Sequence, residues 1–348
     1  MKVAFPGKVV SNDDIIKEIK FHSKNTSPDV LDAVIKKVRF CLDLTGSKHR
    51  KWLLDHEKPI DLVCDAATLA MAESGVAVGD IDLLIYVGIG RGFIEPGGAY
   101  HVASSLGMNS VACFDIIDAC MSWVRGVYLA KLLLDAGIYN RVMIVNAEFN
   151  MIPGGPVYPE VFNIKDVDSL EWSFPSFTLG EAASATILKG GNADSSHGDW
   201  AFEFSSSPRL ADLCNIPIHG FDRYASASPR IAANGCGYFT SFGDKLIEFG
   251  EENILEVMSR LKSKADLSDA KALFTHTSSY RDWLRFCRIL GLQDIYKSIF
   301  SSTGNIVSAS IPAALSLSID EGKVRRGDKI VGWVGSAGMS FSAFSFVY

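Results

Sequence analysis

Short apolar runs of strand length alternate with helical segments along most of this chain. The runs at 81–88, 111–117 and 141–148 are separated by segments in which apolar residues recur at helical spacing. Strands joined by helical crossovers pair in parallel and are covered by helices on both faces. The pattern therefore predicts an α/β fold built on a buried parallel sheet.

The same alternation occurs a second time in the C-terminal half of the chain. Helical patterns at 249–264 and 281–291 flank the apolar run 271–276, and a helix at about 308–321 leads to the run 328–336. A repeat of this length is typical of a duplicated domain and not of a solenoid. We therefore expect two related halves.

The two halves are expected to join in the polar, glycine-rich segment near 190–200, which gives an N-terminal half at 1–195 and a C-terminal half at 196–348. Two further stretches, 150–176 and about 205–243, are rich in proline, glycine and aromatic residues. They are too long for simple connections. Such insertions either shape a site or interface or decorate the surface, and composition leaves both possibilities open.

Composition excludes several classes of protein. Hydrophobic residues make up 48% of the chain and charged residues 21%, which excludes a disordered protein. The net charge of −6 is unfavourable for binding nucleic acid. No apolar run reaches the ~20 residues that cross a bilayer, and the first residues lack the apolar core of a signal peptide. We expect a cytoplasmic protein that binds neither nucleic acid nor a membrane.

The seven cysteines are spread along the chain without CxxC spacing, so we expect no disulfide framework and no metal site. Cys120 differs from the others because it follows an apolar strand and opens an apolar helix. Unpaired N–H groups and the positive end of the helix dipole would favour its thiolate form. The position predicts a nucleophile, although composition alone favours a cysteine buried in the core.

Two polar residues occupy comparable positions in the second half. His276 ends an apolar strand, where it would act as a general base or hydrogen-bond donor. The alternative is a structural histidine that hydrogen-bonds to a neighbouring carbonyl. Asn305 precedes a helix of small residues as the counterpart of Cys120, or serves as an ordinary helix cap. Because the two halves are related, we expect all three residues to meet in one crevice.

Five segments resemble the thiolase-fold condensing enzymes, specifically the ketoacyl-ACP synthase III branch. They are FDIIDAC (114–120), FTLGEAASATIL (177–188), FTH (274–276), TGNIVSASIPAAL (303–315) and GSAGMSFSA (335–343). The resemblance runs over nearly the whole chain. It implies a thiolase-like fold, which is a duplicated α-β-α-β-α sandwich of two pseudo-symmetric halves.

The resemblance also implies roles for individual residues. Cys120 would be acylated, while His276 and Asn305 would stabilise charge on the incoming thioester. The oxyanion hole would combine the N–H groups of Cys120 and Gly338. Met121 and Trp123 stand behind the nucleophile in place of smaller or different residues, so we expect a reshaped acyl pocket.

The implied activity is that of a β-ketoacyl synthase type of acyltransferase. It loads an acyl group from a CoA or acyl-carrier-protein thioester onto Cys120 and condenses it with a second acyl thioester to a β-keto product. No cofactor is expected beyond these thioesters, and the enzyme would be a homodimer or pair with a paralogue. Two alternatives remain: acyl transfer to an alcohol or amine, and a catalytically silent subunit of a paralogous synthase.

Glu95 bears on the type of condensation. The Glu95-Pro96 pair before a helix of small residues resembles the olefin-biosynthesis enzymes, which condense two fatty acyl-CoAs head to head. In those enzymes the matching glutamate lies on a loop that reaches the partner's active site. The glutamate there acts as the base that removes the α-proton. The resemblance implies a base at Glu95, and a solvated loop carboxylate is the alternative.

Departures from the synthase III pattern favour a role in secondary metabolism or specialised lipid synthesis. At three positions where the family commonly has Arg, Asn and His, this chain has Leu44, Ser279 and Thr303. Glu181 alters the usual Gly-Asp-Gly-Ala segment. The first strand is expected to be shortened or absent. These changes make ordinary CoA binding and primary fatty-acid synthesis less expected.

A basic stripe follows His276. Arg281, Arg285 and Arg288 are spaced to lie on one face of the helix at 281–291. In synthase III relatives this helix contacts the acyl carrier protein, so the stripe is interpreted as a dock for an acidic carrier protein. A solvated helix face is the alternative.

Overall fold

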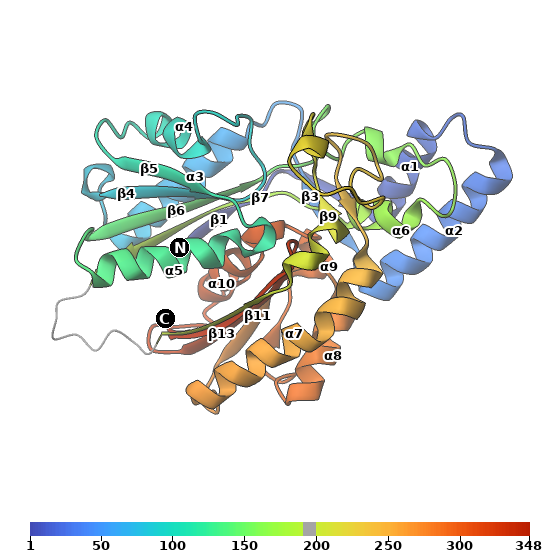
Figure 1. The fold of residues 1–348 in the computed structure, drawn as a ribbon. Helices are drawn as coiled ribbons and strands as arrows, with labels where there is room; N and C mark the ends of the chain where they lie inside the picture. Colours follow the sequence, from blue (N-terminus) through green and yellow to red (C-terminus); the bar gives the residue numbers. More distant parts are fainter. Residues whose placement is uncertain (191–199) are drawn as a thin grey trace.

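The computed structural model describes residues 1–190 and 200–348, which form two five-stranded sheets with helices above, between and below them (Figure 1). The N-terminal sheet has the order β1 (Lys2–Ala4), β7 (Ala182–Lys189), β6 (Arg141–Glu148), β4 (Leu83–Val87) and β5 (Ala112–Ile116). The C-terminal sheet has the order β8 (Ala201–Ser206), β14 (Ser340–Val347), β13 (Lys329–Ser336), β11 (Ala272–Thr275) and β12 (Tyr296–Lys297).

The two sheets have the same strand order and the same strand directions. In each, the first two neighbouring pairs are antiparallel and the last two are parallel. The predicted parallel pairing is confirmed for β4, β5 and β6 and for β11 and β13, and the antiparallel strands β1, β7, β8 and β14 extend each sheet on one side. In the C-terminal sheet β13 and β14 are joined by a tight turn at 337–339, and a connection that short permits only antiparallel pairing.

Three layers of helices enclose the sheets. Helices α3 (Pro59–Ser74) and α4 (Gly98–Ser105) cover the outer face of the N-terminal sheet, and α7 (Gly243–Lys264) and α8 (Tyr280–Leu290) cover that of the C-terminal sheet. Helices α5 (Ser122–Asp135) and α10 (Ser310–Asp320) lie between the sheets (Figure 1). This is the expected five-layer α-β-α-β-α arrangement.

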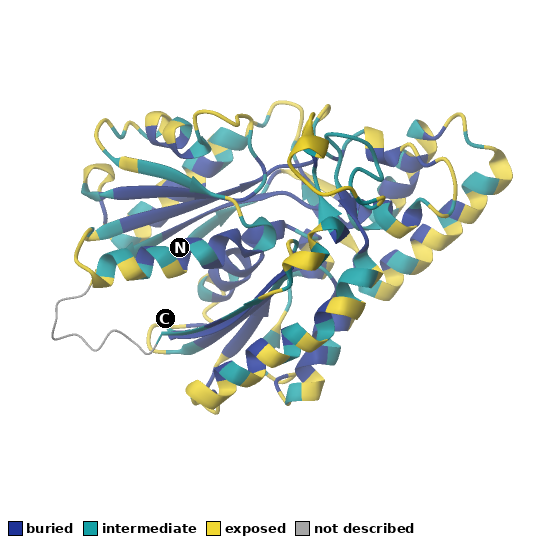
Figure 2. Ribbon diagram, viewed as in Figure 1, coloured by how far each residue is buried: buried dark blue, intermediate teal, exposed yellow. Residues whose placement is uncertain are grey.

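The burial of each helix follows from its sequence. Helix α10 consists of small and apolar residues and is buried on nearly all sides, as a central helix must be (Figure 2). Helices α7 and α8 are amphipathic and turn a charged face to solvent. The core between the sheets includes Ile144, Trp123, Phe274 and Phe344, all at most 2% exposed.

The chain before α3 adds a third structural unit at one end of the sandwich. Helix α1 (Asn12–His22) begins with a capping box between Ser11 and Asp14, and α2 (Pro28–Thr45) follows it. β2 (Lys8–Ser11) pairs with β3 (His49–Trp52) beside them. These helices pack on the segment 151–179, so the first insertion is covered from outside.

Most predicted elements agree with the structure within a few residues, but α7 begins at Gly243, six residues before the helix expected at 249–264. The helix expected to open at Cys120 begins at Ser122 and is preceded by a 3₁₀ turn, Ala119–Met121. The first strand is present as the short β1, which pairs antiparallel with β7. The expected join near 190–200 falls largely outside the described residues. Among the helices described, none is long and apolar enough to cross a membrane.

Candidate active site

Cys120 lies in a strained turn between β5 and α5. The preceding residue, Ala119, has a φ of 44°, in the left-handed region that residues with a Cβ rarely adopt. Two hydrogen bonds hold the turn: the Met121 N–H donates to the Asp118 carbonyl at 2.9 Å, and the Ser122 hydroxyl donates to the Ala119 carbonyl at 2.7 Å. Backbone strain that is held in this way is typical of functional sites.

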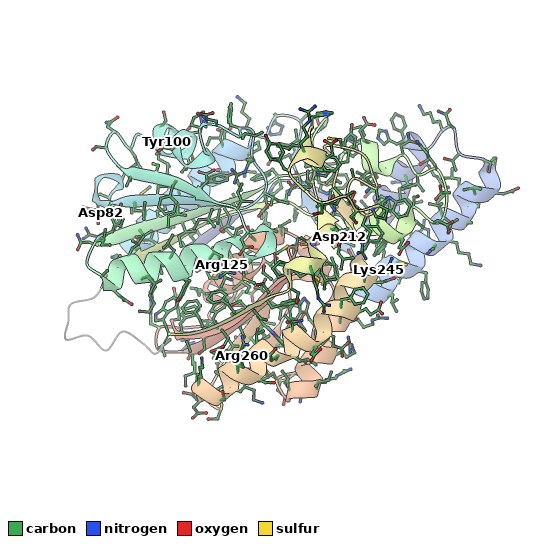
Figure 3. All side chains as sticks on the ribbon, viewed as in Figure 1. Asp82, Tyr100, Arg125, Asp212, Lys245 and Arg260 are labelled. Carbon is green, nitrogen blue, oxygen red and sulfur yellow. The ribbon has the colours of Figure 1, made fainter. Side chains whose placement is uncertain are left out.

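The carboxylate of Asp118 supports the turn from outside. Its Oδ2 accepts a hydrogen bond at 2.7 Å from Nε of Arg125, which lies in the first turn of α5 and is labelled in Figure 3. Both side chains are partly exposed, so the ion pair itself stabilises the protein little. Its effect is to orient the residues on either side of Cys120.

His276 and Asn305 form a direct pair. The His276 side chain follows β11, and its Nε2 lies 3.1 Å from Oδ1 of Asn305. Oδ1 of Asn305 also accepts a hydrogen bond from the Val307 N–H at 2.9 Å. This bond fixes the orientation of the Asn305 side-chain amide, with its Nδ2 group directed away from Val307. Asn305 therefore keeps an N–H donor for a substrate.

Backbone contacts with the segment directly before β7 hold Asn305 in place. The Asn305 N–H donates to the Thr178 carbonyl at 2.8 Å, and its carbonyl accepts the Gly180 N–H at 2.9 Å. A Cβ at Gly180 would collide with the Thr303 carbonyl, so only glycine permits this close approach. The two recognisable segments 177–188 and 303–315 thus meet backbone to backbone.

Neighbouring residues of β13 bring the cysteine and the histidine together. The His276 side chain hydrogen-bonds to the backbone of Gly335, and the Cys120 thiol lies within hydrogen-bonding reach of the Ser336 hydroxyl. The Ser336 hydroxyl also accepts the Met121 N–H at 3.2 Å and donates to the Asp118 carbonyl at 3.2 Å. Cys120 and the His276–Asn305 pair therefore lie against the adjacent residues Ser336 and Gly335 of β13.

The environment of the thiol differs from the expectation. Burial raises the pKa of Cys120 well above its usual range, and nearby Cys214 and Glu148 raise it further, whereas the Ser336 hydroxyl lowers it. The predicted preference for the thiolate is therefore wrong for the free protein. Loss of hydration of the buried thiolate outweighs the helix dipole, since the cysteine precedes α5 in a 3₁₀ turn and does not sit on its first N–H groups.

Burial has the opposite effect on the imidazole. It lowers the pKa of His276 to about 4, against the raising effects of Asn305 and Gly335. The ring is therefore neutral at neutral pH and carries one N–H. With that proton on Nε2, His276 donates to Oδ1 of Asn305. A neutral donor of this kind keeps its proton over the whole range above the low pKa.

The remaining predicted residues lie in varied surroundings. Met121 and Trp123 are buried in the core between the sheets, and the indole N–H of Trp123 donates to Thr186 at 3.0 Å. Gly338 occupies the exposed turn between β13 and β14. Glu95 is exposed on the loop between β4 and α4. The roles given to these four residues stay predictions.

The basic stripe on α8 is partly neutralised. Arg285 forms a bidentate pair with Glu251 of α7, with distances of 2.6 and 2.9 Å. Arg281 contacts the neighbouring Asp282 at 3.4 Å, whereas Arg288 has no ion pair within the described residues and is exposed. Arg281 and Arg288 are thus the arginines of the stripe that remain accessible.

Both insertions border the nucleophile. Cys120 packs against the apolar cluster formed by α1, α2 and the segment 151–179. Cys214, in the short β9 (Cys214–Asn215) of the second insertion, is close enough to influence the thiol pKa. Two surface cavities of about 570 and 610 Å³ lie elsewhere, one against α4 and β5 and one at the amino ends of β11 and β13.

Two residues next to the site were missed from the sequence. Ser336 lies within the segment 335–343, but no feature of the sequence there marks this serine as a functional residue. Glu148 is the last residue of β6 and His276 directly follows β11, so the rule that singled out the histidine also applies to this glutamate. A polar residue directly after a buried parallel strand is the common signal.

Replacing Ser336 with alanine is expected to make the thiol less acidic. The lost hydroxyl lowers the pKa of Cys120, so alkylation by iodoacetamide at pH 8 should slow about three- to tenfold. The rate is followed by intact-protein mass spectrometry. Ser340→Ala, which removes a hydroxyl bonded to Asp118 Oδ1 at 3.4 Å, serves as the control. Equal rates in the wild type and Ser336→Ala would contradict the assignment.

Comparison with known proteins agrees with this geometry. Residues 261–348 match the family described as 3-oxoacyl-[acyl-carrier-protein (ACP)] synthase III C terminal. The chain is 26% identical to β-ketoacyl-[acyl-carrier-protein] synthase III of Symbiobacterium thermophilum, over 99% of this chain and 95% of that protein. It is 27% identical to the synthase III of Clostridioides difficile, over 82% and 83% of the two chains.

Solved structures show the same fold. Cerulenin-bound OleA of Xanthomonas campestris superposes with a TM-score of 0.83 at 19% identity, covering 100% of this chain and 95% of that one. The 3-oxoacyl-[acyl-carrier-protein] synthase III of Aquifex aeolicus gives 0.78 at 22% identity, covering 100% and 98%. The chain therefore has the thiolase fold of these condensing enzymes, and its sequence is similar to that of ketoacyl-ACP synthase III over nearly its whole length.

Proposed function

We propose that this protein forms a carbon–carbon bond between two acyl thioesters, with Cys120 as the acylated nucleophile. One observation carries the proposal: the Cys120 thiol lies beside Ser336 of β13, and His276, which pairs with Asn305, hydrogen-bonds to the adjacent Gly335. A nucleophilic thiol beside two neutral N–H donors suits acyl transfer followed by enolate formation. Specialised lipid synthesis or secondary metabolism is the proposed setting.

In the first step the sulfur of Cys120 attacks the carbonyl of an acyl-CoA or acyl-carrier thioester. The C–S bond of the incoming thioester breaks, and the thiol proton ends on the departing CoA or phosphopantetheine sulfur. The N–H groups of Cys120 and Gly338 are the proposed donors to the tetrahedral oxyanion. Exchange of one thioester for another stores the acyl group without large loss of free energy.

In the second step the His276 Nε2–H turns from Oδ1 of Asn305 to the carbonyl oxygen of the second thioester, and the Asn305 Nδ2–H donates to the same oxygen. Loss of a proton or of CO₂ from the α-carbon gives an enolate, which attacks the Cys120 thioester. A carbon–carbon bond forms, the Cys120 sulfur leaves and it is then reprotonated. Because burial keeps His276 neutral, its N–H is available throughout the neutral pH range.

Fatty acyl chains are the proposed substrates. The thiol packs against the apolar cluster of α1, α2 and 151–179, which provides an apolar environment next to the reacting sulfur. Among the structural neighbours, one form of Xanthomonas campestris OleA is described with bound lauric acid and lauroyl-CoA. We propose that the acyl group on Cys120 lies along this cluster.

A homodimer is proposed, formed through the edge of the N-terminal sheet. Strand β5 is the outermost strand there, so one side of its backbone is open to a second chain. Exposed apolar residues lie near it, including Tyr100, Ile117 and the Phe93-Ile94 pair. Glu95 follows that pair directly, which would bring its carboxylate to the partner's site. Arg281 and Arg288 are the proposed contacts for an acidic carrier protein.

The function is tested by incubating the protein with a panel of acyl-CoAs, with and without a malonyl thioester, and identifying products by mass spectrometry. A β-keto product of two joined chains supports condensation. Esters or amides formed with added alcohols or amines, without β-keto product, would instead favour simple acyl transfer. The absence of any acyl adduct and product would favour a silent subunit.

Glu95→Ala separates the two modes of condensation. If Glu95 removes the α-proton, its loss should reduce condensation of two acyl-CoAs by about 10²- to 10⁴-fold. A reaction driven by decarboxylation of a malonyl thioester needs no base and should be spared. The β-keto products of the two reactions are quantified in parallel, and Glu57→Ala provides a second loop glutamate as control. An equal loss in both reactions would contradict the role as base.

A further inference from the structure

Glu148 is a buried carboxyl group that the proposed mechanism does not use. It ends β6 and is 0% exposed. Four donors surround it: the Ser308 hydroxyl and the Ser308 N–H (3.3 Å) at Oε1, and the N–H groups of Ile89 and Gly90 (both 3.3 Å) at Oε2. No ion pair to this carboxyl is formed in the described residues. Four donors and no cation favour a carboxylate that only accepts.

The two oxygens of Glu148 bind different parts of the site. Oε1 holds Ser308, which lies three residues after Asn305 in the same turn. Oε2 holds the backbone at Ile89 and Gly90, where the loop leading to Glu95 begins. One side chain therefore joins the segment of the amide donor to the loop of the proposed base.

The surrounding residues are fitted to this arrangement. Asn146 donates its Nδ2–H to the Ser308 hydroxyl at 2.9 Å and accepts from the Ser184 hydroxyl at 2.9 Å, which directs the Ser308 proton toward Glu148. A Cβ at Gly88 would lie 2.6 Å from Oε1 of Glu148. The loop can approach the carboxylate this closely because glycine occupies that position.

We propose that Glu148 is a positioning residue that, as a carboxylate, holds the Glu95 loop and the Asn305 segment together for the condensation step. The inference rests on the proposed function for that step, while the clamp itself is a property of the fold. A protonated carboxyl carries a hydrogen that competes with the four donors. Protonation therefore releases one side of the clamp.

The clamp should respond to pH in the neutral range. Burial raises the pKa of Glu148 to about 7, although its four hydrogen bonds lower it. The titratable groups near it are Cys120, before α5, and Tyr86 of β4, and the Glu148 carboxylate raises the pKa of both; Arg91 and Asp115 act on Tyr86 in turn. Burial raises the pKa values of Cys120 and Tyr86, so both stay uncharged as the pH falls from 8 to 6.

Glu148→Gln tests the proposal because an amide cannot accept from all four donors. Its NH₂ group must face either Ser308 or the Ile89 and Gly90 N–H groups, which opens one side of the clamp. In hydrogen exchange, protection of these amides should fall about tenfold relative to wild type. In the wild type, protection should itself decline below pH ~7, and in Glu148→Gln it should be independent of pH.

Condensation is measured as a single turnover from acyl-enzyme prepared in advance, so that thiol acidity does not enter. The wild-type rate should fall below pH ~7. The Glu148→Gln rate should be at least about tenfold lower at pH 8 and lack that pH dependence. Acylation of Cys120 should survive in the variant. The pH dependence is the readout that a merely structural role would not change.

Glu181→Gln is the matched control. Glu181 is also buried, burial raises its pKa to about 7, and it accepts N–H groups from Leu53 (2.8 Å) and Met151 (2.9 Å). This variant should lose protection at Leu53 and Met151 and retain the wild-type pH dependence at Ile89 and Gly90. Retention of that dependence in Glu148→Gln would overturn the proposal. If no thioester acylates the wild type, the proposed function fails, and hydrogen exchange still decides the clamp.

Discussion

Cys120→Ala is expected to lose every acyl adduct and all turnover. The variant lacks the sulfur that would form the thioester, and alanine supplies no replacement nucleophile, so activity should fall on the order of 10⁴-fold or more. Intact-protein mass spectrometry after incubation with acyl-CoA would show one added acyl group on the wild type and none on the variant. The melting temperature is compared to show that both are folded.

The neighbouring thiol provides a strict control for this experiment. Cys214 lies near Cys120, and burial raises its pKa to about 11. Cys214→Ala should keep its adduct, because the proposed nucleophile, Cys120, is intact in this variant. An adduct that persists in Cys120→Ala and disappears in Cys214→Ala would show that Cys214, and not Cys120, is the nucleophile.

Asn305→Ala is expected to stop condensation and leave part of the acylation. The Asn305 amide is one of two donors proposed for the carbonyl of the second thioester, and removal of such a donor costs about 10²- to 10³-fold in rate. Acylation of Cys120 uses other donors and should continue. The two steps are measured separately, as adduct formation by mass and as β-keto product.

Asn305→Asp distinguishes the donor from the local structure. A carboxylate oxygen can still accept the Val307 N–H and the His276 N–H, as Oδ1 does now, but it offers no N–H to a substrate. Condensation should therefore be lost as severely as in Asn305→Ala, with the fold intact. Appreciable condensation by Asn305→Asp would exclude the amide as a donor.

The sequence predicted those parts of the site that rest on strand periodicity. Cys120, His276 and Asn305 each lie at a strand end or before a helix, and such positions converge when parallel strands share an edge. The resemblance to condensing enzymes supplied their roles. Helices α1 and α2, in contrast, were not singled out, although they cover the apolar segment next to Cys120.

The electrostatic state of the site could not be predicted in the same way. Local sequence places Cys120 before a helix, which favours a thiolate, yet burial among residues distant in sequence raises its pKa. Arg285 similarly belongs to a basic stripe in the sequence, but Glu251 on another helix neutralises it. Desolvation and charge pairing depend on tertiary neighbours that periodicity does not reveal.

The equal strand order of the two sheets has an evolutionary consequence. Cys120 follows β5 and Asn305 follows β12, which are equivalent strands of the two copies. In an ancestor assembled from two identical half-length chains, these positions would have carried the same residue. A cysteine in one copy and an asparagine in the other requires duplication of the coding sequence, which lets each copy acquire its own substitution. Covalent attachment and charge stabilisation could then be divided between paralogous halves of one polypeptide.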